Sequence, residues 1–61
     1  MKTLRLVKAT IHGMGMSVQW NSDTREFRVN FPGGAEATAY YTNDADDAIG
    51  TAKAMSDSRT P

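Results

Sequence analysis

The sequence contains no cysteine and only one histidine among its 61 residues. Without cysteine the chain can form neither disulfides nor thiolate metal sites, and one histidine cannot build a histidine-rich metal site. A chain of this length buries only about 60% of its unfolded surface on folding. Such small domains often need a disulfide, a metal or a partner subunit for stability. Because the composition disfavours the first two, we expect self-association to be the natural supplement.

Long apolar runs are also missing. The amino-terminal stretch MKTLRLVKATI contains Arg5 and Lys8, which interrupt the apolar segment that a signal peptide requires. No segment approaches the roughly 20 apolar residues of a membrane-spanning helix. The lack of cysteine fits a reducing compartment. We therefore expect a soluble, cytoplasmic protein that forms one domain over residues 1–61 and does not associate with membranes.

The chain has no excess charge of either sign, because seven basic residues balance seven acidic ones. The two halves nevertheless differ. Residues 1–31 carry five basic and two acidic residues, a net charge of +3, whereas residues 32–61 carry two basic and five acidic residues, a net charge of −3. This asymmetry is consistent with a charged partner on one side, or with chance variation in small numbers.

Two alternating segments, residues 15–21 and 26–31, predict a β-hairpin. The turn-forming residues SDT lie between them. Antiparallel pairing across this turn places three apolar pairs on one face: Trp20 with Phe27, Val18 with Val29, and Met16 with Phe31. A shift of one residue would turn the whole set to the opposite face. The pattern therefore predicts one definite register.

The segment TLRLVKATIH at residues 3–12 predicts a further strand. Alternate side chains would share one face, namely Val7, Ala9 and Ile11. Leu4 and Leu6 have the opposite parity, which implies a bulge near residue 6 or a later start. The GMG sequence that follows predicts a tight turn. The pattern does not show whether this strand pairs in the same sheet as the hairpin.

The second half of the chain predicts a strand and a helix. After a PGG turn, the segment AEATAYYT at residues 35–42 predicts a strand with Tyr40 on the polar face and Tyr41 on the alanine face. Residues 43–56 have apolar side chains at helical spacing, and residues 57–61 predict a frayed tail. The expected fold class is α+β, with a three- to four-stranded antiparallel meander and one C-terminal helix packed on one face.

Catalysis has little support in this sequence. His12 lies at the end of a predicted strand, and a chain this short can scarcely enclose a pocket around it. Asp44, Asp46 and Asp47 lack the later oxygen ligand and the glycine of a calcium loop, and negative charge is favoured at the start of a helix. We expect no enzymatic activity, no cofactor, no metal site and no small-molecule substrate.

The polar face of the predicted sheet is the candidate contact surface. Arginine, glutamine and asparagine can read base edges in a DNA groove, and strands can enter grooves. Six residues are candidate nucleic-acid contacts: Gln19, Arg28, Asn30 and Tyr40 on the face, with Arg25 and Lys8 at its border. In an alternative interpretation, any antiparallel sheet covered on one side simply shows polar residues on the other.

The run FRVNF, a glycine turn, AYYT and DADDAIGTAKAM resembles a family of small DNA-binding domains. These are the amino-terminal arm-binding domains of phage and transposon integrases, which are similar in fold to plant AP2 domains. The matching stretch spans roughly residues 16–56. The resemblance implies that Arg28, Gln19 and Asn30 read bases or backbone. The small size and the lack of a catalytic set are also similar to those of a phage, prophage or mobile-element accessory protein. Members of the family are usually basic, whereas this chain is neutral, which predicts few phosphate contacts.

Two hypotheses about function follow. The first is a non-catalytic module that contacts DNA or RNA through the polar sheet face, and the basic half and the resemblance favour it. The second is a protein–protein interaction module, such as a phage-encoded inhibitor or adaptor, which could also be a homodimer. Neutral charge, small size and the exposure expected of Met14, Leu4 and Leu6 favour this second hypothesis.

Overall fold

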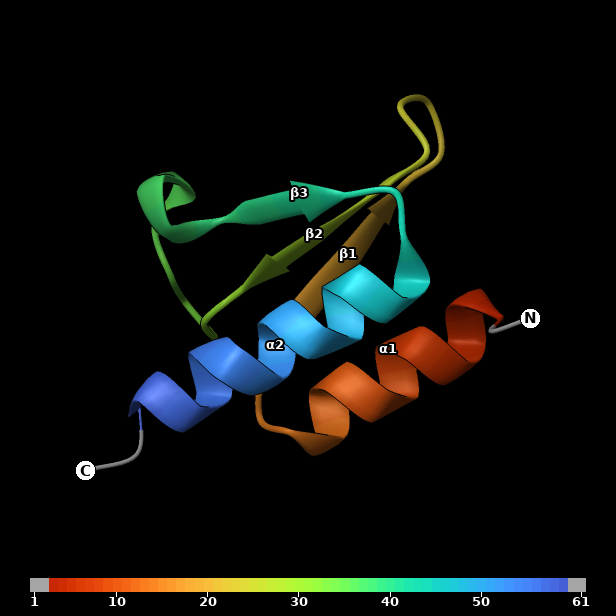
Figure 1. Cartoon of the computed structure of the whole chain (residues 1–61). Helices are drawn as coiled ribbons and strands as arrows, with labels where there is room; N and C mark the ends of the chain where they lie inside the picture. Colours follow the sequence, from red (N-terminus) through yellow and green to blue (C-terminus); the bar gives the residue numbers. More distant parts are fainter. Residues whose placement is uncertain (1–2, 60–61) are drawn as a thin grey trace.

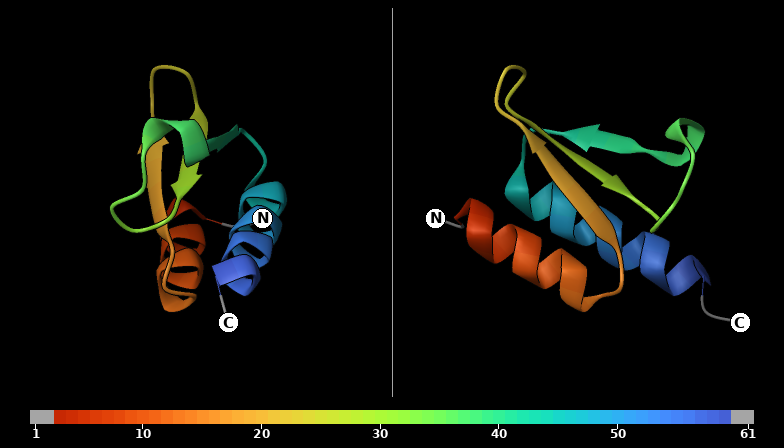
Figure 2. Two further views of the ribbon diagram at one scale, coloured as in Figure 1. Left: turned by 90° about the vertical axis from the view of Figure 1, so that its left-hand side faces the viewer. Right: turned by 180° about the vertical axis from the view of Figure 1, so that it is seen from behind.

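The computed structural model describes residues 3–59, which fold into two layers (Figure 1). One layer is a three-stranded antiparallel sheet in the order β1-β2-β3. The other layer is a pair of helices that lie side by side on one face of the sheet (Figure 2). The elements follow the chain as α1 (Leu4–Gly13), β1 (Ser17–Asn21), β2 (Glu26–Asn30), the 3-10 helix η1 (Glu36–Thr38), β3 (Tyr40–Thr42) and α2 (Ala45–Arg59). The α+β class, the antiparallel meander and the C-terminal helix on one face are confirmed.

The first element is a helix, so the prediction of a strand over residues 3–12 was wrong. Val7 and Ile11, which are four residues apart, are both fully buried, as one face of a helix requires. Ala9 would share their face in a strand, but it is exposed in α1. The irregular parity of the two leucines in this segment was therefore a sign of the helical period and not of a bulge.

Both ends of α1 have defined caps. At the start, the hydroxyl oxygen of Thr3 accepts a hydrogen bond from the Leu6 amide at 3.2 Å. At the end, the amides of Met14 and Met16 donate to the Ile11 carbonyl at 3.1 and 3.2 Å. Gly15 has a φ of 78°, a conformation that glycine adopts without strain. The GMG sequence therefore ends a helix and does not connect two strands.

β1 and β2 form the predicted hairpin in the predicted register. Two of the three predicted pairs lie in the ladder: Val18 with Val29, and Trp20 with Phe27. The rings of Trp20 and Phe27 have centroids 4.7 Å apart and planes tilted by 56°, an arrangement typical of packed aromatic pairs. The third predicted pair, Met16 with Phe31, lies outside the ladder, although Met16 is buried in the core as expected.

Asn30, at the end of β2, organises the loop that follows. Its Nδ2 donates to the Ala35 carbonyl at 3.0 Å, and its Oδ1 accepts from the Phe31 amide at 2.8 Å and from the Thr38 hydroxyl at 2.6 Å. These bonds hold together residues up to eight positions apart in the chain. The side chain of Asn30 therefore acts as the internal support of a loop that ends in η1.

The predicted strand over residues 35–42 is divided by η1, and only its end is extended. β3 begins at Tyr40, which pairs with Val29, and Tyr41 pairs with Arg28. Because η1 interrupts the alternation, the two tyrosines have the opposite parity to that predicted. Tyr40 shares the helix-facing side with Val29, and Tyr41 lies on the other side of the sheet.

α2 is longer than the helix predicted over residues 43–56. Asp44 caps it, because its Oδ1 accepts hydrogen bonds from two amides of the first turn, at 2.8 and 3.1 Å. The helix continues to Arg59. The predicted frayed tail at 57–61 is therefore helical as far as residue 59, and its last two residues lie outside the described residues.

The hydrophobic core lies between the sheet and the two helices. Its buried members are Val7 and Ile11 of α1, Met16, Val18, Phe27 and Val29 of the hairpin region, and Ala48 and Ala52 of α2. The small residues at the interface of helix and sheet thus belong to α2. Ala35 and Ala37, which belong to the alanine face of the strand predicted over residues 35–42, are exposed in the loop before β3.

Two glycines give opposite expectations for stability. Gly50 is exposed in α2 and an added Cβ would meet no atom within 4 Å, so Gly50→Ala should raise the free energy of unfolding by roughly 1 kcal/mol. A Cβ on Gly34 would lie 2.7 Å from Asn30 Oδ1 and 2.9 Å from the Phe31 carbonyl oxygen, so Gly34→Ala should lower it by about 1–3 kcal/mol. Urea denaturation followed by Trp20 fluorescence measures both changes. Shifts of the same sign would contradict the packing of the loop.

Candidate binding face

The face of the sheet turned away from α1 and α2 carries no α-helix of the described residues (Figure 2), and η1 lies beside it, with Glu36 bonded to Arg28. The register brings its side chains together: Gln19 lies opposite Arg28, Asn21 opposite Glu26, and Arg28 opposite Tyr41. We call these five residues the open face. They point away from the helices because their neighbours along each strand point toward them, as the alternation of a strand requires.

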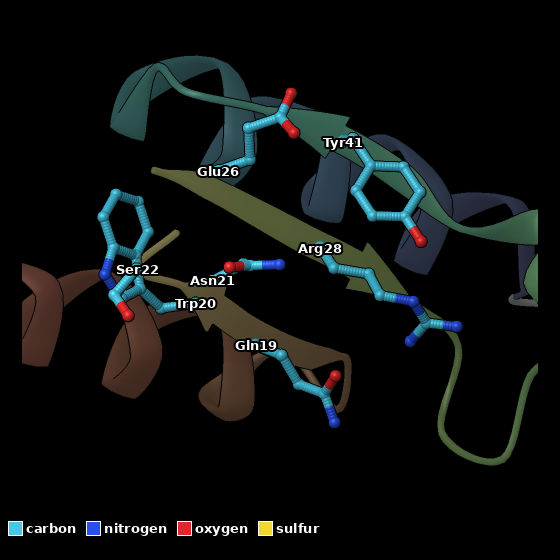
Figure 3. Close-up of a pocket in the computed structure, with 7 residues that line it drawn as sticks. All are labelled: Gln19, Trp20, Asn21, Ser22, Glu26, Arg28 and Tyr41. Atoms are coloured by element: carbon cyan, nitrogen blue, oxygen red, sulfur yellow. The ribbon is translucent and has the colours of Figure 1, made fainter. Parts of the chain in front are cut away.

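A shallow hollow of about 370 Å³ lies on the open face (Figure 3). Trp20 and Ser22 complete its lining. Arg28 and Tyr41 extend from neighbouring positions on β2 and β3, and Gln19 lies across from them on β1 (Figure 3). The hollow is open to solvent and its lining is mainly polar, unlike the enclosed apolar pockets that bind small molecules. Its shape therefore suits contact with a macromolecule.

Arg28 is held in place by Glu36 of η1. Its Nε and Nη2 donate to the two carboxylate oxygens of Glu36, each at 3.5 Å, and the Tyr41 hydroxyl donates to the same carboxylate. The side chain of Arg28 is 26% exposed and that of Glu36 is 66% exposed. The three groups form a partly solvated cluster in which Glu36 compensates the charge of Arg28.

This cluster lowers the pKa of Glu36 below its ordinary value. The hydrogen bond from Tyr41 is the larger cause and the bond from Arg28 the second, since both stabilise the charged carboxylate. A lowered folded-state pKa contributes stability above the unfolded-state pKa, and this contribution is lost as the pH falls through the folded-state pKa. Because the carboxylate is exposed, the contribution is small.

Tyr41→Phe is expected to raise the pKa of Glu36 toward its ordinary value, because it removes the larger of the two causes. Tyr40→Phe is the matched control. The Tyr40 hydroxyl donates to Asp47 at 2.7 Å and lowers the pKa of that carboxyl instead. Carboxyl-carbon chemical shifts recorded from about pH 2 to 7 follow both groups. A Glu36 pKa that responds to Tyr40→Phe and not to Tyr41→Phe would contradict the assignment.

Three of the six predicted contact residues belong to the β1–β2 hairpin and are accessible on it. Gln19 and Arg28 lie opposite each other on the open face. Arg25 is exposed in the turn between β1 and β2, with a φ of 58°. Lys8 was expected at the border of this face, but it lies on α1 in the helix layer.

The other two predicted contact residues are also placed differently from the expectation. Asn30 is 1% exposed and its amide is hydrogen-bonded within the loop, so it cannot reach a ligand. Tyr40 lies on the helix-facing side of the sheet and bonds to Asp47 of α2. Strand parity alone could not show that a loop covers Asn30 or that η1 reverses the parity at Tyr40.

Sequence reasoning missed Tyr41 and Glu36 as partners of Arg28. The prediction treated residues 35–42 as one continuous strand, and this put Tyr41 on the face of the sheet opposite to Arg28. The composition of AEATA was an available signal against this, because alanine and glutamate are depleted in strands and favour helices. A strand that begins only at Tyr40, after a short helical turn, allows Tyr41 to lie opposite Arg28.

No family model, curated protein or solved structure matches this chain. Within residues 3–59, no helix is long and apolar enough to cross a bilayer. The same part of the chain contains no group of three or more His, Cys, Asp or Glu side chains that could hold a metal ion. The function of the open face is therefore inferred from its own geometry and charge.

Proposed function

We propose that this chain is a small non-catalytic protein-binding module whose contact surface is the open face. The observation that carries the proposal is the pairing of Tyr41 with Arg28 on an uncovered sheet. Tyrosine and arginine are enriched where protein interfaces derive most of their binding energy. Tyr41 is 50% exposed, so a partner can bury it. Glu36 holds Arg28 in position before binding, which reduces the entropy lost in the complex.

The charge of this surface favours a protein partner over a nucleic acid. Across the hairpin turn and the open face, the cations Arg25 and Arg28 are matched by Asp23, Glu26 and the Glu36 of η1. Each phosphate contact of a nucleic-acid-binding surface needs a cation. Protein interfaces, in contrast, are about as apolar as the rest of the protein surface, and their centres are depleted of charged residues.

Nucleic-acid binding through the hairpin is the second candidate function. The observation in its favour is shape, since the β1–β2 turn extends beyond the rest of the sheet (Figure 1). Arg25 lies in this turn and Arg28 lies on the strand behind it. A two-stranded ribbon of this kind can enter a major groove. If the chain binds nucleic acid in this way, its resemblance to the integrase arm-binding domains would include their function, and the role would be that of a phage accessory protein.

Affinity capture with matched variants tests the first candidate. Immobilised wild-type chain, Tyr41→Ala and Arg28→Ala are incubated with extract from cells that carry the gene, after circular dichroism has shown that each is folded. Lys53→Ala is the control, because Lys53 is exposed on α2. A central interface residue contributes about 2 kcal/mol or more, so recovery of the partner should fall at least about tenfold with Tyr41→Ala. Equal recovery by Tyr41→Ala and Lys53→Ala would refute the proposal.

Fluorescence anisotropy with labelled DNA and RNA separates the two candidates. Non-specific nucleic-acid binding has dissociation constants on the order of 10⁻⁴ to 10⁻⁶ M at physiological salt. We expect no binding at about 100 µM protein in low salt. Micromolar binding that weakens with added salt and with Arg25→Ala or Arg28→Ala would favour the nucleic-acid function instead.

A further inference from the structure

We propose that the free edge of β1 pairs with β1 of a second copy of this chain, joining two three-stranded sheets into one of six strands. Among the described residues, β1 has a sheet neighbour on one side only, which is β2. The right-hand view of Figure 2 shows no other strand beside this edge. Backbone amides and carbonyls along such an edge can add a further strand.

β1 lacks the features that usually protect an edge strand. Its sequence SVQWN contains neither a charged residue nor proline, and its ladder with β2 runs through all five residues without a bulge. Natural edge strands are commonly blunted by one of these features or by being very short. β3, at the other edge, has only three residues and follows closely on η1. The edge open to pairing is therefore β1.

A second copy fits this edge because β1 is self-complementary about Gln19. An antiparallel pair with its twofold axis at Gln19 places Ser17 opposite the second copy's Asn21, and Val18 opposite the second copy's Trp20. Val18 and Trp20 share the helix-facing side, because they pair with the core residues Val29 and Phe27. An aromatic and a β-branched side chain form a favourable cross-strand pair. No like charges meet anywhere along the joined strands.

Trp20 gives this pairing an apolar anchor. The side chain is packed against the core but remains half-buried, so part of its surface is left for a second copy to cover. Tryptophan is among the residues that most often dominate interface energetics. The added burial would also supplement a domain whose short chain encloses a small core.

The open face of one chain is small compared with a specific protein interface, and pairing through β1 would enlarge it. Strands of at most five residues, with a rise of about 3.4 Å and a spacing of about 4.8 Å, give a three-stranded face of roughly 17 by 14 Å. A specific interface buries about 800 Å² on each partner. Pairing through β1 would double the width of the sheet and place two open faces side by side. The pairing itself needs no partner protein, so it can be tested separately from the proposed function.

Gln19 lies at the twofold axis and its side chain is exposed. Because it also lies opposite Arg28 of its own chain, circular dichroism first establishes that each Gln19 variant is folded. Gln19→Glu places two carboxylates together at the twofold axis, and Gln19→Lys places two ammonium groups there. Like charges directly opposite each other destabilise a strand pair. Lys53→Glu, on the exposed side of α2, is the control for a change of charge elsewhere.

Sedimentation equilibrium measures the mass of each protein. A contact of this size is at the weak end of specific interfaces, so chain concentrations of about 10 to 500 µM are used. We expect the wild-type chain and Lys53→Glu to reach twice the 6.7 kDa of one chain. Gln19→Glu and Gln19→Lys should each stay at 6.7 kDa, and an equal mixture of the two should form a heterodimer.

Three results would overturn the pairing. The first is a wild-type chain that stays at 6.7 kDa throughout this range, and the second is a dimer that both Gln19 variants retain. The third is protection of the β1 amides from hydrogen exchange only after a captured partner is added, which would assign the edge to an extended segment of that partner. Capture by the Tyr41→Ala variant reports on the open face separately, so failure of one proposal is distinguishable from failure of the other.

Discussion

Asn30→Ala is expected to lower the free energy of unfolding by about 2–3 kcal/mol. The Asn30 side chain is 1% exposed and makes three hydrogen bonds, to the Ala35 carbonyl, the Phe31 amide and the Thr38 hydroxyl. Alanine would remove all three of these bonds at the base of the loop, although the Thr38 hydroxyl still donates to the Ala35 carbonyl. A single core in a domain this small rarely supplies more than about 3–5 kcal/mol, so the loss would remove a large part of the total stability.

Urea denaturation followed by Trp20 fluorescence measures this change. Asn43→Ala is the matched control, because Asn43 is exposed at the bend before α2, and it should alter stability by less than about 0.5 kcal/mol. If Asn30→Ala had as small an effect as the control, Asn30 would not support the loop. Its side chain would then be available for the contact role that the strand pattern predicted.

Ile11→Ala is expected to lower the free energy of unfolding by about 3 kcal/mol, as large-to-small substitutions in a core do. Ile11 is fully buried between α1 and the sheet layer. Ala9→Lys, in contrast, should change stability by less than about 0.5 kcal/mol, because Ala9 is exposed on the outer side of α1. In a strand over residues 3–12 the two side chains would share one face, and both substitutions would be severe.

Thermal and urea denaturation of the two variants therefore distinguish a helix from a strand in the amino-terminal segment. Leu6→Ala provides a second control, because Leu6 is 50% exposed and its truncation should have little effect. Severe destabilisation by Ala9→Lys would contradict α1. A mild effect of Ile11→Ala would contradict its place in the core.

The hairpin could be predicted from the sequence because two independent patterns agreed. The turn length and the alternation of both strands allow only the register in which Trp20 meets Phe27. The amino-terminal segment offered no such check, since nothing in the sequence pairs with it. Its Val, Ile and Thr residues suit a strand, whereas burial of Val7 with Ile11 depends on packing against α2 and the sheet.

The candidate site was predicted only in part, and for a similar reason. Gln19 and Arg28 follow from the hairpin register and were found on the open face. The exclusion of Asn30 depends on a loop that folds back over it, and the position of Tyr41 depends on the break made by η1. Neither feature has a period that can be counted along the chain. The loop is held by bonds from Asn30 to residues five and eight positions away, and η1 is a single turn closed by bonds three residues apart.

A photocrosslinker placed on each side of β3 tests the open face most directly as the contact surface. Replacing Tyr41 by p-benzoylphenylalanine keeps an aromatic ring on the open face, and the same replacement of Tyr40 puts it on the helix-facing side. The two positions are similarly exposed, at 50% and 39%. After irradiation in cells, mass spectrometry identifies what each position has captured. We predict a protein crosslink from position 41 that is absent or much weaker from position 40. Equal crosslinks from both positions, or nucleic acid attached at position 41, would contradict the proposed function.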